Sequence, residues 1–447
     1  MKKIFSLLAA LLAIAGLAFA EGEQDAKGGG QVELRVLNYR DLTSSNAATE
    51  IGAVWDAFTK AHPQIKITRE DLFNEPFHNK TEAYAAANRL PDVLYAWPSG
   101  RSTTLHEQKL LKDLTPLIQK DGLKSQFVPA ALDPTGQGGG YVAILPQAIT
   151  SSHAFYVNTA ILQECGLTPA KTYDELKSQV PILKAKGYET VLMANQEMWV
   201  MQSCLFSLLA GRFGGVGWEK KILSGAAKFT DKEFVDALTF VSTLYKDGVL
   251  SQNTLATGYG DVVGQFATKK GAYLIDGDWR IGAFITDSST GKALIPVADQ
   301  QKIRITVFPD IAGAKVNKST STTLGTGWGI STSVPAGSAK EAAAWELVKW
   351  LSGKEIQTWR LQTGAISTPT AVGIDASKLA LEPLQVAGAN LAKEYTTGTA
   401  VIDAVFHSDV YTPINDGLAD IARGSKAPLQ VAQAAQTAFE TWKKNQR

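Results

Sequence analysis

The side chains best suited to chemistry lie in one short stretch, residues 265–280, with the sequence QFATKKGAYLIDGDWR. An apolar run of strand length, 272–275, precedes a carboxylate, an indole and a guanidinium at Asp278, Trp279 and Arg280. An indole packs on the C–H face of a sugar ring, and planar charged groups pair with sugar hydroxyls. The stretch therefore predicts a carbohydrate contact. The alternative is that Asp278 only caps a helix and Trp279 packs in a core.

The elements that position these side chains follow from the same stretch. A short helical pattern ends at Ala267, and Gly271 is expected just past it, in the left-handed conformation that glycine accepts. The strand follows, Gly277 breaks it, and Asp278 is expected to cap a helix that begins at Trp279. In open α/β sheets, turns at the carboxyl ends of strands are where ligands bind.

The first 20 residues have the pattern of a cleavable signal peptide. Lys2 and Lys3 precede an apolar run, and the small residues around Ala20 form a cleavage site. An uncleaved membrane anchor is the alternative, but the apolar run is short for a span. Residues 21–30 are polar and rich in glycine and predict a flexible leader. We therefore expect a periplasmic or extracellular protein.

Composition limits the remaining choices. Loss of Lys2 and Lys3 leaves 42 of the 44 basic residues against 43 acidic ones, which gives no electrostatic case for binding nucleic acid. The length exceeds what one core usually supports, so two domains are expected. Cys165 and Cys204 are the only cysteines. Two small buried thiols are favoured, and a disulfide between them is the alternative.

Strands alternate with helices along the chain, which predicts an α/β fold with mainly parallel sheets. Capping boxes mark three helix starts, at Thr172, Thr230 and Ser338, each with a glutamate three residues later. The sequence contains no nucleophile elbow, zinc-protease motif, phosphate-binding loop or dinucleotide fingerprint, and its five histidines lack metal-ligand spacing. We expect no cofactor, no metal and no catalytic residues.

Several segments, in order, resemble the solute-binding proteins of carbohydrate ABC transporters, the family that includes maltose-binding protein. The resemblance covers about residues 31–447. It rests on FTKAHPQIKI from Phe58, LPDVL from Leu90, LKDLTP from Leu111, FYVN from Phe155, CGL from Cys165, TYDEL from Thr172, QFATKKGAYLIDGDW from Gln265, GTGWGIS from Gly325, AAAWELVKWL from Ala342 and ARG from Ala422.

The resemblance implies a two-lobe periplasmic-binding-protein fold, with a hinge of three crossing segments and a ligand cleft between the lobes. The crossings are expected near 149–152, 307–311 and 364–367. Lobe one would then comprise residues 31–150 and 311–365, and lobe two residues 151–310 and 366–447.

Loops at strand ends supply the candidate ligand residues. Trp279, Glu197 and Trp199 match the positions of sugar-binding residues in the family best, whereas Trp97 and Tyr411 are offset by about a residue. The candidates are Asp41, Trp97, Arg101, Ser151, Glu197, Trp199, Asp278, Trp279, Arg280, Trp328 and Tyr411.

The resemblance implies a monomer that captures a carbohydrate and delivers it to an ABC-type permease in the membrane, without enzymatic activity. Two alternatives stay open: a secreted glycosidase that uses a carboxylate pair such as Glu197 and Asp278, and the binding component of a chemoreceptor. The sequence leaves open which sugar is bound, how long it is, and whether it is neutral or acidic.

Overall fold

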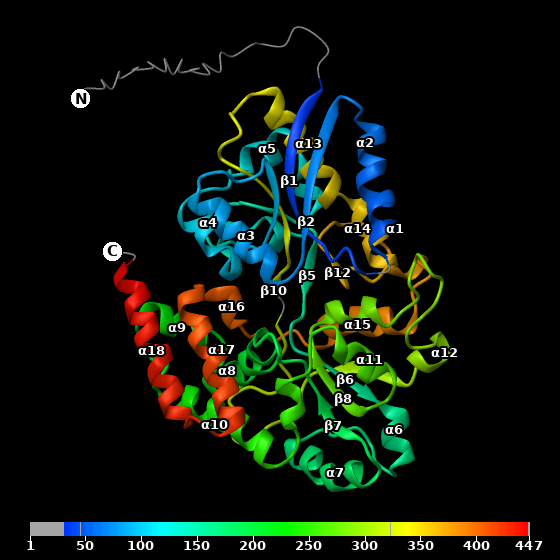
Figure 1. The fold of residues 1–447 in the computed structure, drawn as a ribbon, viewed down its shortest axis with the longest axis vertical. Coiled ribbons are helices and arrows are strands. Elements are labelled where there is room, and N and C mark those ends of the chain that lie inside the picture. Colours follow the sequence, from blue (N-terminus) through cyan, green and yellow to red (C-terminus); the bar gives the residue numbers. More distant parts are fainter. Residues whose placement is uncertain (1–30, 45, 322, 446–447) are drawn as a thin grey trace, which may run out of the picture.

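The computed structural model describes residues 31–44, 46–321 and 323–445. The predicted signal peptide and leader lie outside these residues. Figure 1 shows two lobes, one above the other, with strands β5, β10 and β12 between them. Within the described residues, no helix is long and apolar enough to cross a membrane.

The first lobe, the upper one in Figure 1, is built on a five-stranded sheet with the order β2-β1-β3-β11-β4. Strand β1 pairs in parallel with β2 and β3, whereas β11 runs antiparallel to its neighbours β3 and β4. The strands are β1 (Val32–Tyr39), β2 (Ile65–Leu72), β3 (Val93–Ala96), β4 (Leu145–Pro146) and β11 (Gly327–Ile330). The α-helices are α1 (Ala47–Glu50), α2 (Ala57–Ala61), α3 (Glu75–Ala86), α4 (Thr103–Glu107), α5 (Thr115–Lys120), α13 (Ala339–Ser352) and α14 (Lys354–Gln362).

The alternation of apolar residues in β1 places Leu34 and Val36 in the core of the first lobe. A π-helical turn, η1 (Ile51–Asp56), joins α1 to α2 and buries Val54 and Trp55 against the same core. Short 3₁₀ helices complete the lobe: η2 (Gly100–Ser102), η3 (Leu123–Gln126), η4 (Pro129–Leu132) and η5 (Pro134–Gly136).

The second lobe is built on a four-stranded sheet with the order β7-β8-β6-β9. Its strands are β6 (Ala154–Asn158), β7 (Glu189–Leu192), β8 (Gly271–Asp276) and β9 (Ile303–Thr306). Its α-helices are α6 (Thr159–Glu164), α7 (Tyr173–Ala185), α8 (Ser207–Gly214), α9 (Trp218–Ser224), α10 (Lys232–Lys246), α11 (Asp261–Ala267), α12 (Val297–Gln300), α15 (Pro383–Glu394), α16 (Ile402–Val405), α17 (Ser408–Arg423) and α18 (Pro428–Asn445). The other helical turns are the π-helical η6 (Met201–Phe206) and the 3₁₀ helices η7 (Gln252–Leu255) and η8 (Asp278–Ala283).

Central strand β8 is fully buried, because β6 and β7 flank it and α6 and α11 contact it. Its carboxyl end therefore delivers Asp276 and the following turn to the side of the lobe that faces the hinge. The two-lobe α/β fold predicted from the sequence is confirmed. The prediction of mainly parallel sheets is wrong: β1 pairs in parallel with β2 and β3, and β7 with β8, but β11 is antiparallel to β3 and β4, and β6 is antiparallel to β8 and β9. The chain returns to each sheet through segments that enter from the hinge, and these add strands in the opposite direction.

The hinge sheet consists of β5 (Ala148–Thr150), β10 (Thr323–Leu324) and β12 (Thr368–Pro369), with β5 in the centre and both partners antiparallel to it. The first crossing therefore lies at β5. The second lies later than the predicted 307–311, because Ile311 packs in the core of the second lobe and the Lys315 N–H donates to Arg212 of α8.

The third crossing extends beyond the predicted 364–367. The Thr370 hydroxyl donates to the Pro146 carbonyl, and Ala371 bridges to Phe127, so the chain returns to the first lobe after β12. Only afterwards does it pass through η9 (Ala376–Lys378) to α15, which packs on β9.

Some of the structures predicted at helix ends are confirmed and others are wrong. The capping box at Thr172 is confirmed, and the Ser338 hydroxyl accepts from the Glu341 N–H. The box predicted at Thr230 is wrong, because α10 begins after Asp231 and makes no side-chain cap. The left-handed residue beyond α11 is Lys269 rather than Gly271. Gly271 serves close packing instead, since a Cβ there would lie 2.6 Å from the Leu192 side chain.

Both cysteines are free thiols. Cys204 lies buried in the π-helical turn η6, whereas Cys165 is partly exposed at the end of α6. The unpaired thiols favoured from the sequence are confirmed, but the expectation that both are buried is wrong for Cys165.

Candidate functional site

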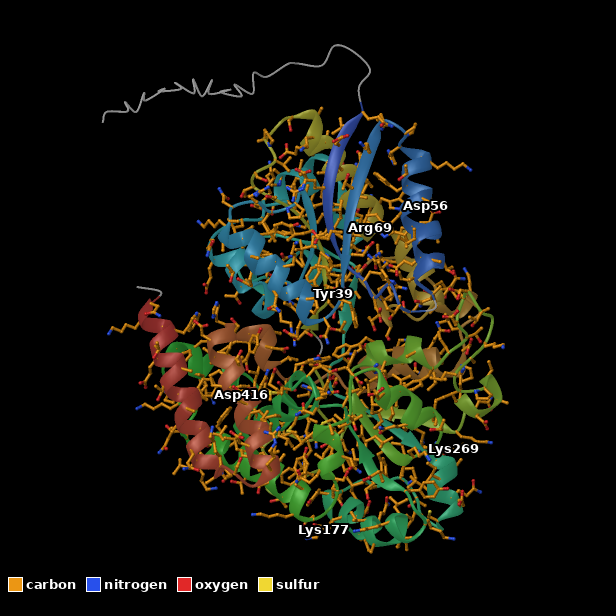
Figure 2. The ribbon with its side chains drawn as sticks, in the orientation of Figure 1. Tyr39, Asp56, Arg69, Lys177, Lys269 and Asp416 are labelled. Carbon is orange, nitrogen blue, oxygen red and sulfur yellow. The ribbon has the colours of Figure 1, made fainter. Side chains whose placement is uncertain are left out.

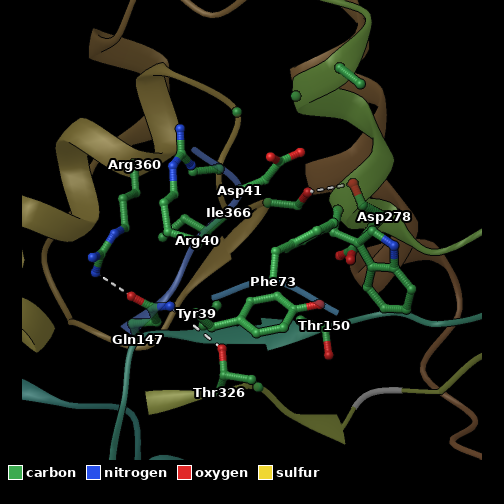
Figure 3. Close-up of a pocket in the computed structure, with 18 of the residues that line it drawn as sticks. Tyr39, Arg40, Asp41, Phe73, Gln147, Thr150, Asp278, Thr326, Arg360 and Ile366 are labelled. Carbon is green, nitrogen blue, oxygen red and sulfur yellow. Dashed lines mark hydrogen bonds between the residues drawn. The ribbon is translucent and has the colours of Figure 1, made fainter. Parts of the chain in front are cut away.

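A cavity of about 940 Å³ lies between the lobes, lined by residues of both lobes and of the hinge. Figure 3 shows part of its wall, with Arg40 and Arg360 on one side and Asp278 on the other. A volume of this size is at the upper end of what small-molecule sites usually offer. The cavity is therefore large enough for a ligand of several rings.

Aromatic rings form the wall on the side of the first lobe. Tyr39, at the end of β1, lies at the edge of the first lobe nearest the second lobe (Figure 2). Its ring stacks on Tyr95 with centroids 5.5 Å apart and meets Trp97 edge to face at 5.2 Å. Because these rings pack against one another, they fix the position of the Trp97 ring at the cavity wall.

Three more rings form the opposite wall, on the second lobe. The Trp199 ring lies 4.9 Å from that of Tyr259 and 6.2 Å from that of Trp279. Trp279 is half-buried, and its ring folds over Gly277, where an added Cβ would lie 2.3 Å from it. The glycine that follows β8 is thus required for the position of the indole.

Asp278 points into the same cavity and is only 3% exposed. Within the described residues, its carboxyl forms no ion pair and no hydrogen bond with another side chain. Burial raises the pKa of Asp278 to about 7, a shift that the backbone N–H groups of Ser151 and Trp279 partly offset. The carboxyl can therefore both accept and donate hydrogen bonds near neutral pH. The predicted helix cap is wrong, because the first turn of η8 has no side-chain cap.

One ion pair joins the two lobes at the edge of the cavity. The Arg101 Nε, on η2, lies 2.9 Å from the Asp403 carboxylate on α16, which also accepts from the Ser203 hydroxyl at 3.3 Å. Beside this pair, the Ser99 hydroxyl donates to the Ala404 carbonyl. The lobes therefore touch through charge and backbone at this edge of the cavity.

His78 supports Arg101 within the first lobe. Burial and the neighbouring Arg101 lower the pKa of His78 to about 3, so its ring is neutral and its Nε2 accepts from the guanidinium at 3.1 Å. The Arg101 guanidinium also lies 5.4 Å from the centre of the Trp199 ring, across the lobe boundary.

Seven of the predicted site residues line the cavity: Asp41, Trp97, Arg101, Trp199, Asp278, Trp279 and Trp328. Their orientations differ. Trp328 is 1% exposed and packs edge to face between Trp55 and Tyr95. Its ring therefore lies in the core and offers almost no surface to a ligand in the cavity. The Asp41 carboxylate accepts from the N–H and hydroxyl of Thr43, and the residue is half-exposed at the cavity wall.

The structure does not bring the other four predicted residues to the cavity. Ser151 is buried and uses its carbonyl to accept from the Asp278 N–H. Tyr411 is half-buried on α17 and packs against the second-lobe core.

Glu197 and Arg280 act behind the aromatic wall. The Glu197 carboxylate accepts from the Tyr259 N–H at 3.1 Å, and the Arg280 guanidinium lies 3.7 Å from the centre of the Tyr259 ring. Arg280 also pairs with buried Asp276 at 2.7 Å. Both side chains therefore fix the position of Tyr259 rather than face the cavity.

Several lining residues were not among the candidates selected from the sequence. Tyr39, Gln147, Tyr259, Arg360 and Asp403 come from five separate segments, and none stands in a motif. Tyr39 could have been found from its place at the carboxyl end of β1, by the same argument that singled out residue 278.

Among residues 31–44, 46–321 and 323–445, no group of three or more His, Cys, Asp or Glu side chains is arranged to hold a metal ion. Two α/β lobes, a three-stranded hinge and an aromatic cavity between the lobes define the class of two-lobe solute-binding proteins. Residues 43–358 match the family of bacterial extracellular solute-binding proteins, and the chain belongs to that family.

Solved structures of the same fold cover nearly the whole chain. One, from a study of xylan utilization by the thermophilic bacterium Caldanaerobius polysaccharolyticus, is 22% identical with a TM-score of 0.79 and covers 91% of this chain and 99% of its own. A chitin oligosaccharide binding protein is 21% identical with a TM-score of 0.79, covering 92% and 98%. The protein RafE in complex with raffinose is 20% identical with a TM-score of 0.68, covering 92% and 99%. Comparison with curated protein sequences gives no significant match.

Proposed function

We propose that this protein binds a carbohydrate in the cavity between its lobes and delivers it to an ABC-type permease in the membrane. The observation that carries the proposal is the pair of facing aromatic walls, with Tyr39 and Trp97 on one lobe and Trp199, Tyr259 and Trp279 on the other. Stacking on such rings and hydrogen bonds to planar polar groups are the two contacts that sugars require.

Transport fits the family and the names of the structural relatives, which include a chitin oligosaccharide binding protein and a raffinose complex. We propose that the chain is exported by its amino-terminal signal peptide and acts as a monomer outside the cytoplasm. Ligand contacts from both lobes would favour closure, because contacts to a single lobe cannot bias a hinge.

Binding is favoured over hydrolysis by the position of the carboxylates. Asp278 lines the cavity, but Glu197 does not, so the pair considered for a glycosidase does not meet in the cavity. We therefore propose that a bound sugar is returned unchanged. Incubation with oligosaccharides followed by chromatography tests this statement, and any new shorter product would contradict it.

Replacement of Trp279 with alanine tests the site itself. Affinity for the sugar that gives the largest thermal shift in a panel should fall about fivefold or more, because a lost aromatic stack costs about 1 kcal/mol. Since Trp279 is half-buried, the ligand-free protein should lose less stability than the roughly 3–5 kcal/mol of a core tryptophan.

The matched control is Trp442→Ala. Trp442 packs on His407 and Phe439 and does not line the cavity, so the control removes an indole without touching the site. Calorimetric titration of both variants gives the affinities. Unchanged affinity in a folded Trp279→Ala protein, or an equal loss in both variants, would refute the assignment.

A further inference from the structure

The cavity contains three arginines, and each is already neutralised by protein groups. Arg40 lies 2.5 Å from the Glu50 carboxylate and also donates to Ser44 and Asn46. Arg360, only 3% exposed, donates to Gln147 and to a main-chain carbonyl, and its Nη2 lies 3.8 Å from the same Glu50. Glu50 therefore balances two guanidinium groups in one corner of the cavity.

Arg101 is paired in the same way, with Asp403 at 2.9 Å and Glu75 at 3.8 Å. Breaking a buried pair leaves one charge without compensation, which is costly. A ligand carboxylate could recruit Arg40, Arg101 or Arg360 only at this cost. The fourth cation of the lining, Lys292, is exposed, so water screens its charge.

The carboxyl of Asp278 is the exception to this pairing. It is buried, faces the cavity, and joins no ion pair within the described residues. In total, four cationic and five anionic side chains line the cavity, so the lining offers no excess of positive charge. A ligand hydroxyl can donate to the Asp278 carboxylate, whereas a second carboxylate placed there would meet a like charge in a poorly solvated site.

We propose that the cleft selects uncharged carbohydrates and rejects sugars that carry a carboxylate, with Asp278 as the residue that sets this discrimination. The proposal rests on the carbohydrate-binding function argued above and narrows its substrate class. The paired arginines make the cavity polar without making it attractive to anions. Asp278 adds a buried acceptor that ring hydroxyls can satisfy and that a ligand carboxylate cannot.

Matched pairs of sugars test the proposal on the wild-type protein at pH 8. The pairs are glucose with glucuronic acid, galactobiose with digalacturonate, and cellobiose with cellobiuronate. In each pair that binds, calorimetric titration should give about tenfold tighter binding of the neutral member, because at pH 8 the acidic member must either face the Asp278 carboxylate or bind together with a proton on it. Equal or tighter binding of the acidic member would overturn the proposal while leaving carbohydrate binding intact.

Asp278→Asn tests the residue. This nearly isosteric change removes the charge, and the preference for the neutral sugar should shrink several-fold. Asp416→Asn is the control, because Asp416 is exposed on α17, away from the cavity (Figure 2). An unchanged preference in a folded Asp278→Asn protein would remove Asp278 from the proposal. Absence of binding to every sugar, neutral or acidic, would instead contradict the proposed function.

Discussion

Asp278→Asn should change how the stability of the ligand-free protein depends on pH. Burial raises the pKa of Asp278 in the folded protein to about 7, whereas the ordinary pKa of an aspartate in the unfolded chain is 3.8. Between these values the folded state binds a proton that the unfolded state has lost, so stability falls as pH rises through this window. This difference in pKa lowers the unfolding free energy of the wild-type protein by about 4 kcal/mol between the two ends of the window.

The variant has no carboxyl at this position and escapes the loss. The unfolding free energy of the variant should therefore rise relative to that of the wild type as pH increases from about 4 to about 7, by up to about 4 kcal/mol. Above about pH 7 this difference should stay constant. Two neighbouring phenols, Tyr156 and Tyr259, stay neutral in this range, because burial raises their pKa values well above 10. The neighbouring Arg280 guanidinium is held by its ion pair with Asp276.

Melting temperatures of the two proteins and of Asp416→Asn, measured without ligand from pH 4 to pH 8.5, provide the assay. For domains of lobe size, each kcal/mol shifts the midpoint by about 2–4 °C, so the difference between wild type and Asp278→Asn should grow to several degrees. Curves that stay parallel at all pH values would refute the reasoning. They would show that the Asp278 carboxyl ionises in the folded protein as it does in water, and hence that the cavity does not desolvate it.

Two further predictions concern the lobe contact and the amino terminus. Asp403→Asn removes the ion pair with Arg101 that joins the lobes, so the ligand-free variant should show a larger radius of gyration in solution scattering than the wild type; an unchanged radius would mean that this pair does not hold the lobes together. The exported protein should begin at Glu21 by amino-terminal sequencing, and a retained Met1 would contradict cleavage after Ala20.

Local patterns predicted the parts of the fold that local physics determines. The apolar run before Gly277 became the buried strand β8, and the turn after it carries Asp278 and Trp279 to the cavity. The same reasoning failed for Arg280, because in the 3₁₀ turn of η8 its side chain reaches back to Asp276 at the end of the strand. A sequence of neighbouring polar residues does not show which of them faces a ligand and which supports the wall.

Contacts between distant segments were the other source of error. Ile311 is apolar, as expected for a residue in a strand that crosses between the lobes, yet it packs in the core of the second lobe. The reason is that the Arg212 guanidinium on α8 donates to the carbonyls of Phe308 and Pro309 and holds this segment in the second lobe. No feature near residue 403 predicts its pairing with residue 101, since about three hundred positions separate the two. Such pairings depend on the assembled lobes and leave no local pattern.

The contacts between the lobes bear on the energy that a ligand must supply. A shift from mostly open to mostly closed requires about 5.5 kcal/mol of preference for the closed state. Here Arg101 and Asp403 already meet across the lobes, and the backbones approach so closely that a Cβ on Gly100 would lie 1.7 Å from the Asp403 carbonyl oxygen. Because these contacts join the two lobes directly, they reduce the preference that the sugar itself must provide. A ligand that stacks on Trp97 of one lobe and Trp279 of the other adds the remainder, whereas a ligand held by one lobe alone adds nothing.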